Sequence, residues 1–171
     1  DTDYLELPEA AVITPMKDHQ RYFPLRDSED RLMNMFLTVR NGDDYHLDTV
    51  RHGNERVLRA RLDDAKFFFA EDRKKSLADR TEDLKRIVFQ DGLGTLFDKS
   101  QRLAAIMTFL TAKLDLPVEE GEIKHLADLA KTDLLTQMVQ EFTELQGVMG
   151  REYALLDGEE PETAEAVFEQ Y

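Results

Sequence analysis

The stretch VLRARLDDAKFFF, residues 57–69, decides how most of this chain folds. Its apolar residues recur at spacings of four, three and four positions, at Leu58, Leu62, Ala65 and Phe69. Such spacing places the four side chains in one stripe along an α-helix. We predict that this helix starts near residue 48, with Asp48 or Thr49 as its N-cap.

Basic residues lie on a different side of the same predicted helix. Arg56, Arg59 and Lys66 follow one another at helical spacings, and Arg73 and Lys74 come soon after. Basic side chains beside aromatic ones are typical of a nucleic-acid surface, so these five residues are our candidate RNA contacts. The alternative is an ordinary amphipathic helix whose cations pair with the acids around them. Those acids are Glu55, Asp63, Asp64, Glu71 and Asp72.

Charge is distributed unevenly along the 171 residues, whose net charge is −14. Residues 1–50 have a net charge of −6, residues 51–113 of +4 and residues 114–171 of −12. A basic middle segment between acidic flanks can attract an anionic partner. No run reaches the roughly 20 apolar residues of a membrane-spanning helix. Cysteine is absent, which excludes disulfides and cysteine-based sites and fits a reducing, cytoplasmic location.

The residues before the long helix read as a small β element. Three stretches, 10–16, 20–25 and 32–39, are rich in apolar and β-branched or aromatic residues, and Asn41-Gly42 is a turn dipeptide. We predict two or three strands here. So small a sheet is marginal alone, so we expect residues 1–47 to be an incomplete β element that packs on helices or joins a larger sheet.

Residues 48–171 read as a helical domain. After the first helix we predict helices over about 76–89, 95–114 and 118–142, a short helix at 151–156 and a last one from Pro161. The apolar stripe of the helix at 95–114 consists of Leu96, Leu103, Ile106, Leu110 and Leu114. The fold class is α+β and predominantly α. We expect the sequence to be an internal piece of a longer polypeptide whose last helix is truncated.

Motifs for catalysis are incomplete, so we predict no catalytic residue and no metal ligand. The four histidines, at 19, 46, 52 and 125, lack the spacing of a zinc site and no His-Asp dipeptide occurs. Gly92-Leu93-Gly94 lacks the rest of a nucleotide-binding loop and reads as a helix–helix turn. Gly147-Val148-Met149-Gly150 reads as a tight turn between acidic flanks. Asp133 lies near a predicted core face, where Lys131 is the expected partner, and Asp98 has Arg102 four residues ahead.

Long ordered runs resemble the β subunit of the two-subunit bacterial glycyl-tRNA synthetase. The runs that carry the resemblance are LPEAAVITPMKDHQRYFPL (7–25), GNERVLRARLDDAKFFFAEDRKKSLADR (53–80), VFQDGLGTLFDKSQRL (88–103) and KTDLLTQMVQEFTELQGVMGREYALLDGE (131–159). They cover nearly the whole chain, which would be roughly a quarter of that subunit. Such runs are far more specific than any of the short motifs.

The resemblance implies a role in ATP-dependent charging of tRNA with glycine. In this family the α subunit holds the glycine and ATP site, with Mg²⁺ for the whole enzyme, and the β subunit binds tRNA and supports the α subunit in an α/β heterotetramer. Residues 1–47 would end an editing-domain-like region, and residues 48–171 would form an HD-type-like helical domain. The fragment itself would have no cofactor and no catalytic residue.

Two other functions remain open from the residues alone. One is an inactive relic of an HD-type metal phosphohydrolase, which the missing His-Asp dipeptide disfavours. The other is a helical protein-interaction module that uses the acidic residues 114–171. Metal analysis distinguishes the phosphohydrolase relic from the other functions. A salt-dependent tRNA titration distinguishes a tRNA-binding chain from a module that binds only protein.

Overall fold

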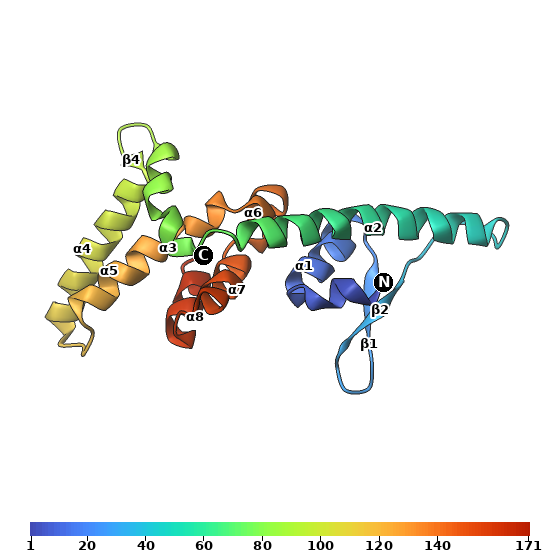
Figure 1. Cartoon of the computed structure of the whole chain (residues 1–171), viewed down its shortest axis with the longest axis horizontal. Helices are drawn as coiled ribbons and strands as arrows, with labels where there is room; N and C mark the ends of the chain where they lie inside the picture. The colour runs from blue at the N-terminus through green and yellow to red at the C-terminus, as the bar shows by residue number, and fades with distance from the viewer. The chain divides into compact units, whose positions relative to one another are not determined.

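The computed structural model describes residues 1–171 and divides them into two compact units, Asp1–Glu71 and Asp72–Tyr171. Helices dominate both units, and the strands form two separate two-stranded sheets (Figure 1). The predicted α+β, predominantly helical class is therefore confirmed. The division into compact units falls after Glu71, and the predicted domain boundary after residue 47 stays a prediction. The editing-domain-like and HD-type-like labels stay predictions.

The first unit combines short helices, one hairpin and one long helix. Its elements are the 3-10 helix η1 (Thr2–Glu6), α1 (Glu9–Thr14), the π-helical turn η2 (Pro15–His19), β1 (Phe23–Arg26), β2 (Leu32–Leu37) and α2 (Leu47–Asp72). β1 and β2 are antiparallel, with Phe23 opposite Leu37, and the register shifts between Pro24 and Arg26. The long helix is confirmed, but it begins at Leu47, so neither Asp48 nor Thr49 is its N-cap.

The strand expected over residues 10–16 is wrong, because these residues are helical. Ala11, Val12 and Met16 are all buried, which is the one-sided pattern of a helix rather than the alternation of a strand. Val12 and Met16 line the same hollow as Leu58 and Leu62 of α2, which are at most 5% exposed. Burial of this apolar face outweighs the strand preference of Val12 and its neighbours.

The second unit begins with short elements and the hairpin that precedes its longest helix. These are α3 (Leu77–Arg80), the 3-10 helix η3 (Thr81–Arg86), β3 (Val88–Gln90), β4 (Gly94–Thr95) and α4 (Leu96–Leu114). The helix expected to reach residue 89 thus ends at Arg86. Gly92-Leu93-Gly94 forms a hairpin turn, not the helix–helix turn we predicted, and Gly92 and Gly94 both have positive φ. Their freedom from a Cβ lets the chain reverse within three residues.

The helix α4 starts where the sequence indicates. Thr95 is its N-cap, and its hydroxyl accepts a hydrogen bond from the Asp98 N–H. The Asp98 carboxylate accepts in return from the Thr95 N–H at 2.7 Å, which completes a capping box. Asp98 is therefore a cap rather than an ion-pair partner of Arg102 alone, and Thr95 lowers its pKa through these hydrogen bonds.

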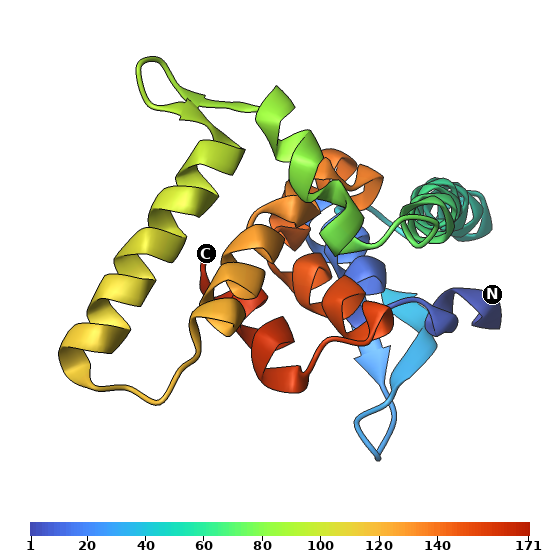
Figure 2. The same cartoon turned by 60° about the vertical axis from the view of Figure 1, so that its left-hand side comes forward.

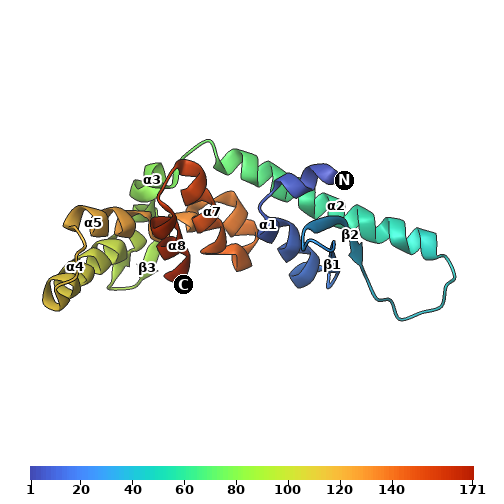
Figure 3. The same cartoon turned by 90° about the horizontal axis from the view of Figure 1, so that it is seen from below.

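The rest of the second unit is a set of short helices. They are α5 (Glu120–Leu129), the 3-10 helix η4 (Thr132–Leu135), α6 (Gln137–Glu141), the 3-10 helix η5 (Thr143–Leu145), α7 (Val148–Asp157) and α8 (Pro161–Glu169). The single helix expected over 118–142 is wrong, because Lys131 has a φ of 69° and breaks it. The helices at 151–156 and from Pro161 are confirmed, and α7 and α8 lie side by side (Figure 3).

The core of the second unit lies among α3, α5, α6, α7 and α8. Met138, Phe142, Met149, Ala154 and Val167 are completely buried there. Gly147 precedes α7 with a φ of +78°, and Gly150 lies inside the first turn of α7. A Cβ at Gly150 would come within 2.9 Å of a Val167 methyl group, so the missing side chain lets α7 approach α8 closely.

Candidate functional site

The cations predicted to meet RNA form an exposed surface on α2, which we call the α2 basic face and define as Arg56, Arg59 and Lys66. All three are exposed and lie on a different side of the helix from the buried Leu58 and Leu62. The structure of α2 is thus compatible with the predicted placement of the three cations on one face of the helix. That this face contacts RNA remains a prediction.

Two acids compensate part of the charge on the α2 basic face. Asp63 lies between Arg59 and Lys66 along α2 and accepts a hydrogen bond from the Tyr4 hydroxyl at 2.6 Å. Lys66 Nζ lies 3.8 Å from Asp3 Oδ2, so this cation is shared with an acid of η1. Burial of Tyr4, together with the bond to Asp63, raises the pKa of its phenol to about 12 and keeps it a donor.

Arg73 and Lys74 follow directly after α2 and are exposed. They belong to the second compact unit, whereas the α2 basic face belongs to the first. That Arg73 and Lys74 contact RNA stays a prediction.

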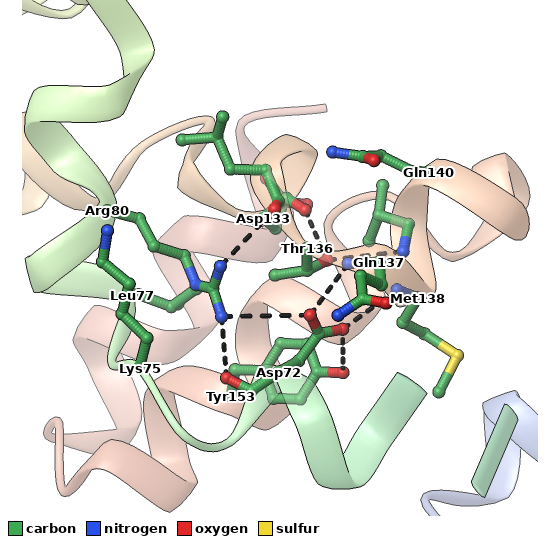
Figure 4. A network of polar contacts seen from close by, with 12 residues as sticks. Asp72, Lys75, Leu77, Arg80, Asp133, Thr136, Gln137, Met138, Gln140 and Tyr153 are labelled. Carbon is green, nitrogen blue, oxygen red and sulfur yellow. Dashed lines mark hydrogen bonds and ion pairs between the residues drawn. The ribbon is translucent and has the colours of Figure 1, made fainter. Parts of the chain in front are cut away.

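A polar network that sequence reasoning missed surrounds Asp72, the last residue of α2 (Figure 4). Its side chain is only 2% exposed. The carboxylate accepts hydrogen bonds from the backbone N–H groups of Gln137 at 2.8 Å and Met138 at 2.9 Å. These are the first two residues of α6, whose N-cap is Thr136, so Asp72 supplies further acceptors to this helix start from 65 residues away.

A tyrosine and an arginine complete the Asp72 network. The Tyr153 hydroxyl of α7 donates to Asp72 Oδ2 at 3.0 Å, and burial beside this carboxylate raises the pKa of Tyr153. An Arg80 nitrogen lies 3.9 Å from Asp72 Oδ1 and donates to the Asp72 carbonyl at 2.7 Å. Asp72 therefore joins α3, α6 and α7 through one nearly buried ion pair and its hydrogen bonds.

A second buried carboxylate, Asp133, is completely inaccessible to solvent. It accepts hydrogen bonds from the Gly147 N–H at 2.7 Å and the Tyr171 hydroxyl at 2.8 Å. The predicted partner Lys131 contacts the Tyr171 ring, with Nζ 3.3 Å from its centroid, and its charge favours the ionised form of Asp133 from there. Burial raises the pKa of Asp133 and lowers that of Lys131 to about 8.

The Gly-x-x-Gly motif at 147–150 is explained by Asp133. A Cβ at Gly150 would lie 3.2 Å from Asp133 Cβ, and the Gly147 amide donates directly to the carboxylate. The motif thus allows the start of α7 to approach a buried acid.

Histidines and acids form no group of three that could hold a metal ion. His125 Nε2 lies 2.7 Å from Glu159 Oε2, and His52 Nδ1 lies 2.8 Å from the Asp48 carbonyl. No helix is both long and apolar enough to cross a membrane. What the described side chains offer is an exposed basic surface and two buried carboxylates that organise helix starts.

The family model and similar known proteins agree on one protein family. The family model described as glycyl-tRNA synthetase beta subunit matches residues 1–171. The glycine–tRNA ligase beta subunit of Desulforudis audaxviator is 55% identical over 169 residues, which cover 98% of this chain and 25% of that protein. The corresponding subunit of Desulforamulus reducens is 53% identical over 172 residues, with 100% and 25% coverage.

These relatives are subunits of an aminoacyl-tRNA synthetase. The chain belongs to the glycyl-tRNA synthetase beta subunit family. The resemblance inferred from the ordered runs of sequence is thereby confirmed. The chain spans about a quarter of the length of the curated relatives it matches.

Proposed function

We propose that this chain acts as part of the β subunit of glycine–tRNA ligase in the ATP-dependent charging of tRNA with glycine. The observation that carries this proposal is the family match over all 171 residues, at 55% identity to one relative. In this proposal the chain itself performs no chemical step. ATP, Mg²⁺ and glycine are bound by the α subunit, and the enzyme is an α/β heterotetramer in the cytoplasm.

We further propose that the α2 basic face contacts the tRNA backbone. Its three cations are exposed and belong to the segment 51–113, whose net charge is +4 in a chain of −14. Arg56 and Arg59 are the better candidates, because Lys66 already faces Asp3. Each cation that neutralises a phosphate contributes about 0.7 to 0.9 to the slope of log affinity against log salt concentration.

The test is a double charge reversal in the intact enzyme, Arg56→Glu with Arg59→Glu. Tyr4, Asp63 and the buried stripe of α2 keep their residues, so we expect the fold to persist. The KM for tRNA should rise and the salt dependence of tRNA binding should flatten, while glycine-dependent pyrophosphate exchange stays unchanged.

The matched control is Lys17→Glu with Arg31→Glu, which changes the net charge by the same amount elsewhere in the first unit. Both residues are exposed, and Arg31 forms ion pairs only with Asp27 and Glu29. If both double variants change tRNA affinity equally, the effect comes from net charge and the specific role of the α2 basic face is refuted. If neither changes it, this face is a solvated helix surface.

A further inference from the structure

The helix α4 directs its more apolar side away from its own unit. Three large apolar residues on this side are strongly exposed: Ile106 at 54%, Leu110 at 46% and Leu114 at 63%. The side toward α5 carries mostly small or polar residues, with Phe109 lining a groove beside Glu120 and Lys124 of α5. Gln101 on that side donates a hydrogen bond to Asp128 of α5 at 3.0 Å. Within residues 72–171, Figures 1 and 2 show no other element beyond α4 on the side opposite α5.

This arrangement contradicts the ordinary interpretation of the sequence. Leu103, Ile106, Leu110 and Leu114 are spaced by three, four and four residues, which is the pattern of a helix that packs on another helix. We call these four residues the seam of α4. Within residues 72–171 the seam has no partner helix. The seam consists of several neighbouring apolar residues rather than one isolated exposed residue. Contiguous apolar patches of this kind mark interaction surfaces.

The same side of α4 is basic. Lys99, Arg102 and Lys113 lie among the apolar residues of the seam, and no acidic residue occurs between Asp98 and Asp115. We call the seam and these three cations the outer face of α4. The hairpin extends this face, since Lys99 Nζ lies 4.4 Å from the ring centroid of Phe89 in β3.

Charge and shape select among the possible occupants. A second copy docked antiparallel on the same face would place Lys99 of one copy near Lys113 of the other, and like charges oppose that contact. RNA would satisfy the three cations but would leave the aliphatic seam against phosphates and sugars. A helix with an apolar stripe bordered by Asp and Glu satisfies both the seam and the cations.

We propose that the outer face of α4 is the docking site of an acidic amphipathic helix from the same β subunit, outside residues 1–171. The relatives that match this chain have about three quarters of their length outside the match, so such β subunits contain ample further sequence. A segment of the same polypeptide also has a high effective concentration, which favours it over a separate molecule.

The first test is site-specific photo-crosslinking in the full-length β subunit that carries this sequence, produced without the α subunit and without tRNA. Benzoylphenylalanine replaces Ile106 of the seam in one variant and Ala112 in the control; Ala112 is exposed on another side of the same helix. We expect position 106, and not position 112, to give an intramolecular product. Peptide mass spectrometry should place it on an acidic helical segment outside residues 1–171.

Several crosslinking results would overturn the proposal. They are a covalent β dimer, no product from position 106, or equal products from both positions. In a parallel sample with the α subunit and tRNA added, transfer of the crosslink from position 106 to either of them would also overturn it.

The second test measures hydrogen exchange of the α4 backbone in the same full-length subunit. Leu110→Glu should speed exchange about tenfold relative to Ala112→Glu, which corresponds to about 1.4 kcal/mol of docking free energy. The double variant Arg102→Glu with Lys113→Glu should also speed hydrogen exchange of α4. The new glutamates can remain in solvent, but their negative charges repel the acidic residues of the docked helix. Equal exchange in the Leu110→Glu and Ala112→Glu variants would overturn the proposal.

Discussion

Replacing Asp72 with alanine should destabilise the second unit more than any other single loss of a carboxylate discussed above. The change removes the acceptor for the Gln137 and Met138 amides and for the Tyr153 hydroxyl. It also leaves the Arg80 guanidinium, whose side chain is 12% exposed, without its counter-ion.

The magnitude follows from these contacts. Breaking a buried ion pair by removing one partner costs about 3–5 kcal/mol. An independent estimate comes from the hydrogen bonds, since each hydrogen bond to a charged group contributes about 1.5–3 kcal/mol. Because whole domains are stable by only about 5–15 kcal/mol, the second unit should be largely or wholly unfolded at moderate urea.

The assay is urea unfolding followed by far-UV circular dichroism, combined with hydrogen exchange of peptides from α6 and α7. Tyr153→Phe removes one hydrogen bond and should cost about 1 kcal/mol. Asp91→Ala removes the same charge from an exposed turn and should stay within about 0.5 kcal/mol of wild type. If Asp72→Ala unfolds within about 1 kcal/mol of wild type, and α6 exchanges no faster, the structural role of the network is refuted.

Three further predictions concern other positions. Burial raises the pKa of Asp133, so the folded state binds its proton more tightly than the unfolded state and stability falls as pH rises from about 4 through the raised pKa. Asp133→Asn should flatten this part of the curve of unfolding free energy against pH, and an unchanged curve would contradict the assignment. Gly150→Ala should cost about 1–3 kcal/mol in thermal unfolding, because its Cβ meets Val167 at 2.9 Å; a variant as stable as wild type would show that α8 moves aside freely. Thr95→Ala should cost about 1 kcal/mol and increase exchange at the start of α4, whereas loss of protection at its far end alone would argue against a capping role.

Helices with a strong apolar period and a recognisable start could be predicted from the sequence. The stripe at Leu58, Leu62 and Ala65 indicated α2, and Thr95 and Pro161 are found at the starts of α4 and α8. These signals are local, so they depend on residues within one or two turns.

Elements that depend on distant contacts could not be predicted in this way. The run at residues 10–16 is helical because it packs in a core shared with α2, and no local preference shows that. Asp72 looked like one more acid on a charged helix, yet its partners Gln137, Met138 and Tyr153 lie 65 to 81 residues further along the chain. The only local signal for it was the position of an acid at the end of a long helix, eight residues before Arg80.

The candidate surface was predictable in composition but not in extent. Arg56, Arg59 and Lys66 lie together on α2, as their spacing indicated, but nothing in the sequence showed that Lys66 faces Asp3. For the seam of α4, the spacing of its residues was predictable but its exposure was not. Its pattern predicted a buried face, whereas the fold places that face on the surface of its unit.

The separation between Asp72 and its partners has a consequence for synthesis on the ribosome. The carboxylate and the Tyr153 hydroxyl are 81 residues apart in the chain. At a translation rate of about 5–20 residues per second, about 4–16 s pass between the addition of Asp72 and the addition of Tyr153 to the growing chain. During this interval Leu77 and Leu84, which end up completely or almost completely buried, have no finished core to enter. The nascent second unit is therefore a natural substrate for chaperones until α7 has been translated.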